Sequence, residues 1–282
     1  MAKYSIEDVY SEFNKIDSYF CEKKLKGGGT SEHTNKSIRN YCPYYSSLGY
    51  NYCMNYLQMA SSGVINLLEN LKKYDLEYDK LAEYAILFLS YKLKQHSQLK
   101  STKLDHFYTK HIENNNYYNT KINGDGSPTY KEIINKNKDL MNTNEISKFN
   151  DPFSILVLLY NEIKKRDMDC TKCSTKANEF VQNFEKLNDD SNINGNASYS
   201  KLLFTLSDDY NNLKNKCPNF QSLPEIKTPP SKLIPVLSTF SVIPVFLGIA
   251  YKYSLFGIDK LFQRQYLRKK LKKIKKKMKI NI

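Results

Sequence analysis

Apolar residues recur every three or four positions along most of the first 216 residues, and this spacing predicts a largely helical protein. The first apolar face is formed by Ile6, Val9, Phe13, Ile16 and Phe20. Ser5 stands where a side chain can cap the start of this helix. The glycines at 27–29 are expected to end the element.

Seven further helices are predicted from the same spacing, over residues 50–74, 79–98, 104–112, 130–141, 153–167, 176–187 and 199–216. The strongest is 79–98, which has Leu81, Ala85, Phe88 and Leu89 on one side. Residues 113–128 are expected to form a loop and residues 188–198 a polar linker. No segment alternates between apolar and polar residues with a period of two, so no strand is predicted. Residues 1–217 are therefore expected to fold as one all-α domain.

The pattern changes after residue 217. Four prolines within residues 218–232 predict an extended stalk. Leu233 to Tyr251 is then 19 residues without a charge, and a short apolar stretch continues to Ile258. As a helix, 19 residues extend about 28 Å, close to the ~30 Å of a bilayer core. We predict one transmembrane helix over residues 233–258. The alternative, a buried core helix, is disfavoured by the length of the run and by the charges that follow it.

Residues 259–282 form a basic tail that carries eleven Lys or Arg against one Asp. The side chains expected to face anionic lipid are Arg268, Lys269, Lys270, Lys272, Lys273, Lys275, Lys276 and Lys277. Translocation of so many cations is disfavoured, so the tail is predicted to be cytoplasmic and residues 1–232 to lie on the other side of the membrane. The chain opens without an apolar signal segment, and we assign its targeting to the transmembrane span.

The formal net charge of +14 belongs mainly to that tail. Residues 1–232 contain 31 basic and 28 acidic side chains, a net charge of only +3. A general nucleic-acid surface on the N-terminal domain is therefore not expected.

The chain has six cysteines, Cys21, Cys42, Cys53, Cys170, Cys173 and Cys217. An even number in a domain predicted to face outside indicates disulfides, for which 15 complete pairings exist. Three cysteines precede residue 54 and three follow residue 169, so complete pairing needs at least one bridge between the two groups. That bridge would stabilise the fold by about 4–5 kcal/mol in the chain-entropy model. The Cys170-Thr-Lys-Cys173 motif lacks the second ligand pair that zinc requires.

No catalytic, cofactor-binding or metal-binding site is predicted. The histidines, His33, His96, His106 and His111, are scattered and form no metal-ligand motif. The glycines at 27–29 lack the preceding strand and the following Lys of a phosphate loop. The acidic pairs Asp189-Asp190 and Asp208-Asp209 point apart on a helix and are interpreted as solvated surface. Exposed tyrosines among the 23 would suit a binding surface, but the pattern does not show which are exposed.

Several segments nevertheless resemble one family along nearly the whole chain. They are Tyr41-Cys42-Pro43, Asp79–Gln95, Asp105–Glu113, Lys138–Phe149, Cys170–Cys173, Tyr199–Cys217, Ser222–Ile226, Lys232–Gly257 and Gln265–Arg268. The C-terminal block is the most specific. Together they are similar to the Plasmodium interspersed repeat (PIR) proteins of malaria parasites, especially rodent-parasite members. The sequence departs at Phe88, where the family has Trp, and it matches weakly over Ser46–Asn70, where family members vary.

The resemblance implies a disulfide-bonded, all-helical ectodomain and carries no catalytic residue. It implies a variant surface antigen, exported to the infected red cell or its membranes, that acts in antigenic variation, immune evasion and host-cell adhesion. Host receptors or antibodies would then be its partners. The alternative is an intracellular membrane-anchored organiser that docks on anionic lipid through its Lys-rich tail.

Overall fold

The computed structural model describes residues 5–163 and 169–227. The predicted transmembrane helix at 233–258 and the basic tail at 259–282 lie outside the described residues. Within the described residues, none of the helices combines the length and the apolar character needed to cross a bilayer.

Helices dominate the described part of the chain. The longer ones are α1 (Ile6–Asp17), α2 (Tyr56–Leu71), α3 (Tyr78–Gln95), α6 (Asn150–Ile163), α7 (Cys170–Asp189) and α9 (Ala197–Lys216). The short ones are α4 (Leu104–Phe107), α5 (Tyr130–Asn135) and α8 (Ser191–Asn194). Short turns of one or two windings are η1 (Lys36–Tyr41), η2 (Lys72–Tyr74), the π-helical η3 (Tyr108–Ile112), η4 (Asn116–Asn119), η5 (Lys138–Met141) and η6 (Asn144–Phe149).

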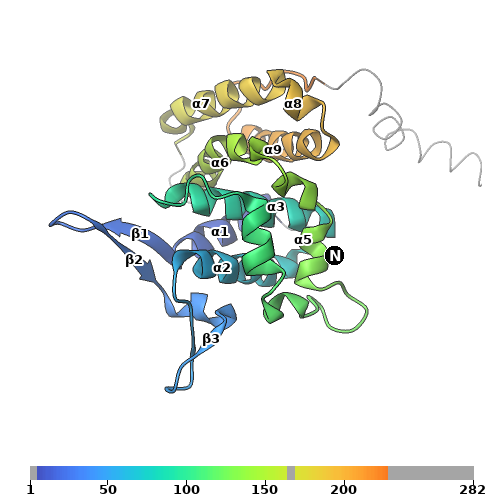
Figure 1. Cartoon of the computed structure of the whole chain (residues 1–282). Helices are drawn as coiled ribbons and strands as arrows, with labels where there is room; N and C mark the ends of the chain where they lie inside the picture. The colour runs from blue at the N-terminus through green and yellow to red at the C-terminus, as the bar shows by residue number, and fades with distance from the viewer. Residues whose placement is uncertain (1–4, 164–168, 228–282) are drawn as a thin grey trace, which may run out of the picture. The chain divides into compact units, whose positions relative to one another are not determined.

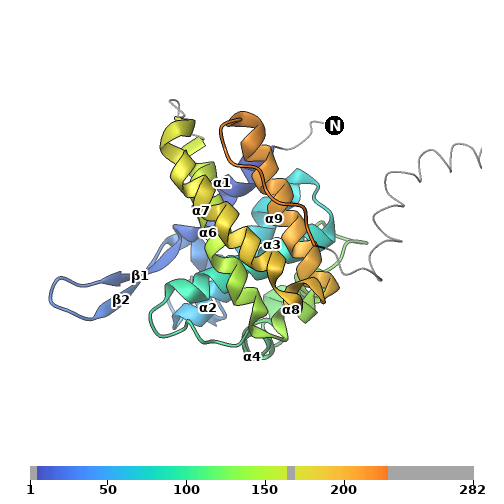
Figure 2. The ribbon, with the colours of Figure 1, turned by 90° about the horizontal axis from the view of Figure 1, so that it is seen from above.

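The core is built around α3, which lies in the middle of the helical body and contacts α2, α5 and α6 (Figure 1). Residues 81–90 of α3 are all buried, on every face of the helix. This helix therefore has no solvent-facing stripe over those turns, as expected for an element enclosed by others. On the far side of α6, α7 and α9 run side by side with α8 at their junction (Figure 2).

Two β-hairpins correct the expectation of an all-α domain. β1 (Phe20–Lys24) pairs with β2 (Thr30–Thr34), and β3 (Tyr44–Tyr45) pairs with β4 (Asn51–Tyr52), both antiparallel. Glycines with φ values of about +80 to +90°, at positions 28, 29 and 49, form the turns, where a Cβ atom would be strained. Both hairpins project from the helical body (Figure 1). Because their residues are mostly exposed on both faces, no apolar alternation marks them in the sequence.

The start of α1 after the Ser5 cap agrees with the prediction, but polar caps place the starts of some other helices away from the residues that the periodicity predicts. Asn55 accepts a hydrogen bond from the Gln58 amide, so α2 begins at Tyr56 and not near residue 50. Asp169 caps α7, which begins at Cys170, six residues before the predicted start at 176. The expected polar linker at 188–198 contains the short helix α8, which Asp190 caps.

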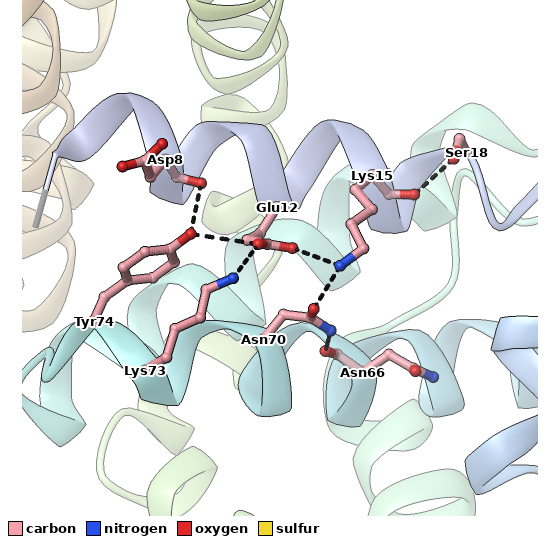
Figure 3. Close-up of polar contacts among 8 residues, drawn as sticks. All are labelled: Asp8, Glu12, Lys15, Ser18, Asn66, Asn70, Lys73 and Tyr74. Atoms are coloured by element: carbon pink, nitrogen blue, oxygen red, sulfur yellow. Dashed lines mark hydrogen bonds and ion pairs between the residues drawn. The ribbon is translucent and has the colours of Figure 1, made fainter.

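A polar cluster ties α1 to the end of α2 (Figure 3). The Glu12 carboxylate accepts hydrogen bonds from Lys73 at 2.6 Å, Lys15 at 3.2 Å and the Tyr74 hydroxyl at 3.3 Å. Lys15 also donates to the Asn70 side chain at 2.7 Å. Burial opposes ionisation of Glu12, but the two ammonium groups prevail and hold the pKa of its carboxyl below the usual value. The cluster therefore keeps a nearly buried carboxylate charged and paired.

The residues after α9 pack against the body although they form no regular element. The Tyr210 hydroxyl donates to the carbonyl of Gln221 at 2.9 Å. The Asn188 amide donates to the Glu225 carbonyl and accepts from the Lys227 amide, each at 2.8 Å. The compact unit therefore extends to Lys227, into the segment expected to be a stalk at 218–232.

Candidate binding surface

Two disulfides are present in the described residues, Cys42–Cys53 and Cys170–Cys217. Their Cα atoms are 4.9 and 5.6 Å apart, within the range that a disulfide can span. Each joins cysteines of the same sequence group, so the bridge expected between the two groups is not among them. The cysteines outside these disulfides are Cys21 and Cys173. The two halves of the domain are instead held together by the core that α1, α3, α6 and α9 share.

The Cys42–Cys53 disulfide closes a loop that carries the hairpin β3–β4, and residues 42–54 are called the tyrosine loop below. Its base is fixed to the body. Cys42 follows η1, whose Ile38 carbonyl accepts a hydrogen bond from Ser62 of α2. The Asn51 side chain donates to the Asn40 carbonyl at 3.3 Å and to the Tyr117 hydroxyl at 2.7 Å. The body therefore holds both ends of the loop in place.

The tyrosine loop concentrates exposed apolar surface. Eight large apolar side chains are exposed among the described residues, and six of them are Tyr44, Tyr45, Leu48, Tyr50, Tyr52 and Met54. Tyr45 is 73% exposed and Leu48 78% exposed. Tyr and Met are enriched at protein interfaces, and clustered exposed apolar side chains mark interaction sites. From the sequence we expected that exposed tyrosines would suit a binding surface, but the pattern did not show that these tyrosines are the exposed ones.

A groove of about 850 Å³ separates η1 from the tyrosine loop. It is lined by Lys36, Arg39, Asn40, Tyr41, Tyr45, Gly49, Tyr50 and Asn51. The Arg39 guanidinium lies 4.9 Å from the centre of the Tyr50 ring, a cation–π contact. The Tyr44 and Tyr52 rings lie side by side across the hairpin, with centres 5.6 Å apart. The groove thus offers cations, amides and aromatic faces together.

Tyrosines elsewhere surround a buried carboxylate. Asp209 on α9 is 2% exposed and accepts hydrogen bonds from the hydroxyls of Tyr10 at 2.8 Å and Tyr84 at 2.9 Å. The Tyr160 hydroxyl donates to the Asp209 carbonyl at 2.6 Å. Burial raises the pKa of Asp209 to about 6, against the opposing effects of Lys80 and the two hydroxyl donors. This cluster links α1, α3, α6 and α9 and is structural.

The buried cluster corrects the interpretation of Asp208-Asp209 as solvated surface. The two side chains do point apart, but only Asp208 is exposed. Asp209 belongs to the face of α9 that also buries Leu202, Leu206 and Leu213. In the pair Asp189-Asp190, Asp190 also has a structural role. Its side chain caps α8 and accepts a hydrogen bond from Lys148 at 2.6 Å.

A polar cleft of about 620 Å³ lies beside Asp209, between the start of α1 and α9. Glu7 and Lys216 form an ion pair within it, and Lys80 lies 4.0 Å from Asp209. Glu7 and Lys80 thus each have an oppositely charged neighbour. None of the described residues that line this cleft is among the large apolar side chains that are exposed.

The histidines do not converge. His33 and His106 are exposed, whereas His96 is buried with its Nε2 atom 3.4 Å from a Glu32 oxygen. Burial, followed by the charges of Lys110 and His106, lowers the pKa of His111. No set of three metal-ligating side chains gathers in the residues that the structure describes. The glycines at 27–29 do follow a strand, contrary to expectation, but a second strand follows them and the segment is a hairpin turn.

Comparison with known proteins gives a match to a family model and matches to solved structures. The family model described as Plasmodium variant antigen protein Cir/Yir/Bir matches residues 10–252. The solved structure of a Plasmodium PIR protein ectodomain shares 33% sequence identity and superimposes with a TM-score of 0.57. That match covers 80% of this chain and 100% of the other. No curated protein matches the sequence.

Proposed function

The chain belongs to the Plasmodium Cir/Yir/Bir variant antigen family, and from this premise we propose that it is a membrane-anchored variant antigen whose helical domain is an ectodomain. In this proposal residues 233–258 span a membrane of the infected red cell or a parasite-derived membrane. The basic tail at 259–282 stays cytoplasmic and contacts anionic lipid. The likeness to a PIR ectodomain over the described domain supports the outward orientation.

The functional proposal rests on the structure of the tyrosine loop. It is exposed, closed by a disulfide and held by the body at both ends. Its sequence between the two cysteines contains Tyr, Ser, Gly, Asn, Leu and Pro only. Tyr, Ser, Gly and Asn are also the residues that antibody loops favour, because Tyr supplies rigid contact area and the others adaptable hydrogen bonding. A pre-closed loop loses less conformational entropy on binding.

We therefore assign host-cell adhesion to the tyrosine loop, with a host receptor as the partner. Antigenic variation and immune evasion follow in the same proposal, because residues 46–54 of the loop lie in the weakly matching region Ser46–Asn70. Changes at exposed loop positions alter the surface that antibodies contact without disturbing the core. The proposal includes no enzymatic activity.

Protease shaving of intact infected cells tests the orientation. Antibodies to the helical domain and to the basic tail are applied after treatment of intact cells and of permeabilised cells. The proposal expects loss of the domain signal with a protected tail. Protection of both until permeabilisation would reject surface exposure. It would favour the alternative function, an internal membrane organiser that binds anionic lipid through its Lys-rich tail.

A paired variant tests the role of the loop. Tyr45→Ala removes the most exposed ring of the loop, and Leu158→Ala removes a side chain that is 48% exposed on α6, outside the loop. Adhesion of cells that carry each variant is compared with wild type at equal surface expression. We expect Tyr45→Ala to weaken adhesion and Leu158→Ala to leave it unchanged. If cells with either variant adhere equally well, the tyrosine loop is not the adhesion surface.

A further inference from the structure

Positive charge without an ion pair is found at the groove, on η1, and also on the hairpin β1–β2. Among the described residues, five cations of the hairpin β1–β2 and of η1 form no ion pair with a carboxylate: Lys23, Lys24, Lys26, Lys36 and Arg39. The three lysines of the hairpin are exposed, and Lys36 is exposed at the groove. The hairpin β1–β2 and the hairpin β3–β4 project from the helical body in different directions (Figure 1), so Lys36 and Arg39 are the two of these cations that line the groove.

Negative charge is scarce in the same part of the chain. No Asp or Glu occurs between residues 33 and 68, a stretch that includes η1 and the whole tyrosine loop. The flanking acids are engaged elsewhere. Glu22 accepts from the Ser97 amide and hydroxyl at 2.7 and 2.6 Å. Glu32 lies 3.4 Å from His96. Glu69 pairs with Lys72 at 2.8 Å.

We propose that the groove between η1 and the tyrosine loop binds an acidic segment of a partner protein. This inference rests on the proposed function, because it names the partner of the same surface. Lys36 and Arg39 contact carboxylates of the segment, and the Arg39 fork can bind one of them through two parallel hydrogen bonds. The exposed rings of Tyr45 and Tyr50 cover its apolar side chains.

The apolar part of the surface favours a protein segment over an acidic polysaccharide. Leu48 and Met54 are among the exposed side chains of the loop, and aliphatic groups of this kind are buried by other side chains at protein interfaces. The exposed lysines of β1–β2 add to the positive charge of the domain outside the groove. They are expected to speed the encounter with an acidic partner, whereas the groove contacts determine how long it stays bound.

Selection from a library tests the partner's chemistry without knowledge of its identity. Phage that display random 12-residue peptides are panned against the full-length chain. Recovered clones are counter-screened on the Tyr45→Ala variant to retain those that need the loop. We expect these loop-dependent peptides to carry net negative charge together with aromatic or aliphatic residues.

Binding of the best synthetic peptide is then measured on three proteins. Arg39→Gln is expected to weaken it about tenfold, since it removes a charge-assisted pair. Lys186→Gln removes an exposed, unpaired cation from α7 and is expected to leave binding unchanged. Raising the salt concentration should weaken binding to wild type more than binding to Arg39→Gln.

The outcomes separate the two proposals. Loop-dependent peptides that are neutral or basic would overturn the acidic-partner inference and leave the tyrosine loop as a binding surface. Recovery of no loop-dependent peptide would overturn both. Acidic peptides that bind Arg39→Gln and wild type with equal affinity would also overturn the inference. Competition with heparin, a sulfated polysaccharide, gives a further test. The inference would be overturned if heparin displaced the peptides, bound the protein at least tenfold more tightly than they do, and depended on Tyr45 for its binding.

Discussion

Tyrosine plays opposite roles in two regions of this molecule. In the helical body, Tyr10 and Tyr84 are completely buried and each hydroxyl donates to Asp209. In the tyrosine loop, Tyr45 and Tyr50 expose their rings and line a groove. The abundance of tyrosine in the sequence therefore does not by itself indicate whether the side chains serve stability or binding. A hydroxyl that is satisfied inside the core holds helices together, whereas an exposed ring on a fixed loop is available to a partner.

The two regions should therefore respond differently to substitution. Body variants should change the free energy of unfolding. Substitutions of the exposed side chains of the loop, which leave its disulfide intact, should change binding with little effect on stability. The predictions below test this division, beginning with the largest expected effect.

Removal of the Cys170–Cys217 disulfide should destabilise the body strongly. With Ala at both positions the unfolded chain loses the constraint of a loop with a sequence separation of 47. The chain-entropy model gives a loss of about 4 kcal/mol. The Cys42–Cys53 bridge has a separation of only 11, and its removal should cost about 3 kcal/mol. Urea unfolding of both double variants gives the comparison, and a larger loss for the loop bridge would contradict it.

Tyr84→Ala should also unfold the body readily. The side chain is completely buried, and truncation of a core aromatic residue costs about 3–5 kcal/mol. Two of the hydrogen-bond contacts to Asp209 disappear with the hydroxyl. Tyr45→Ala is the matched loop variant and should change stability by less than about 0.5 kcal/mol. Similar losses for both variants by urea denaturation would break the division between body and loop.

Asp209 should make the body less stable as the pH rises. Its pKa is raised from the ordinary 3.8 to about 6 in the folded state. Its contribution is thus fully present below pH 3.8 and is lost as the pH rises through about 6, with a magnitude of about 3 kcal/mol. Asp209→Asn cannot ionise and should remove this part of the pH dependence. The free energy of unfolding of wild type and Asp209→Asn is measured between pH 4 and pH 8. If it changed with pH in the same way for both proteins, Asp209 would not be the source of this pH dependence.

Glu12 should show a smaller effect of opposite sign. Its folded-state pKa is lowered, so its contribution is present above the pKa of the unfolded chain and is lost as the pH falls. Its partners Lys15 and Lys73 are about half exposed, and solvent screening limits the loss for Glu12→Gln to about 1 kcal/mol at neutral pH. The measurement is urea unfolding at pH 7 and pH 4, where the difference between variant and wild type should shrink at the lower pH.

The helical body could largely be predicted from the sequence, because its apolar faces repeat with the helical period. The spacing predicts that the residues of α3 at positions 81, 85, 88 and 89 share one side of a helix, and all four are buried. Helix ends were less predictable, since side-chain caps such as Asp169 set them. The face of α9 that holds Asp209 repeats Leu at 202, 206 and 213, and this spacing was a signal that the carboxylate would be buried.

The candidate surface was harder to predict. Hairpins with both faces exposed leave no alternating pattern, so β1–β2 and β3–β4 were missed. The pairing of Cys42 with Cys53 depends on the fold of η1 and α2 around the loop. A signal was nonetheless present, because four tyrosines lie between these two cysteines in a stretch without acidic residues.

The central claim is that the tyrosine loop is an exposed binding surface on a membrane-anchored antigen. An antibody raised against the disulfide-closed peptide of residues 42–54 tests this claim most directly. Flow cytometry would compare its binding to intact infected cells that carry wild type, Tyr45→Ala or Leu158→Ala. The account predicts labelling of wild type and Leu158→Ala, with labelling of Tyr45→Ala strongly reduced, and inhibition of adhesion by the antibody. Labelling only after permeabilisation, or labelled cells whose adhesion is unaffected, would contradict it.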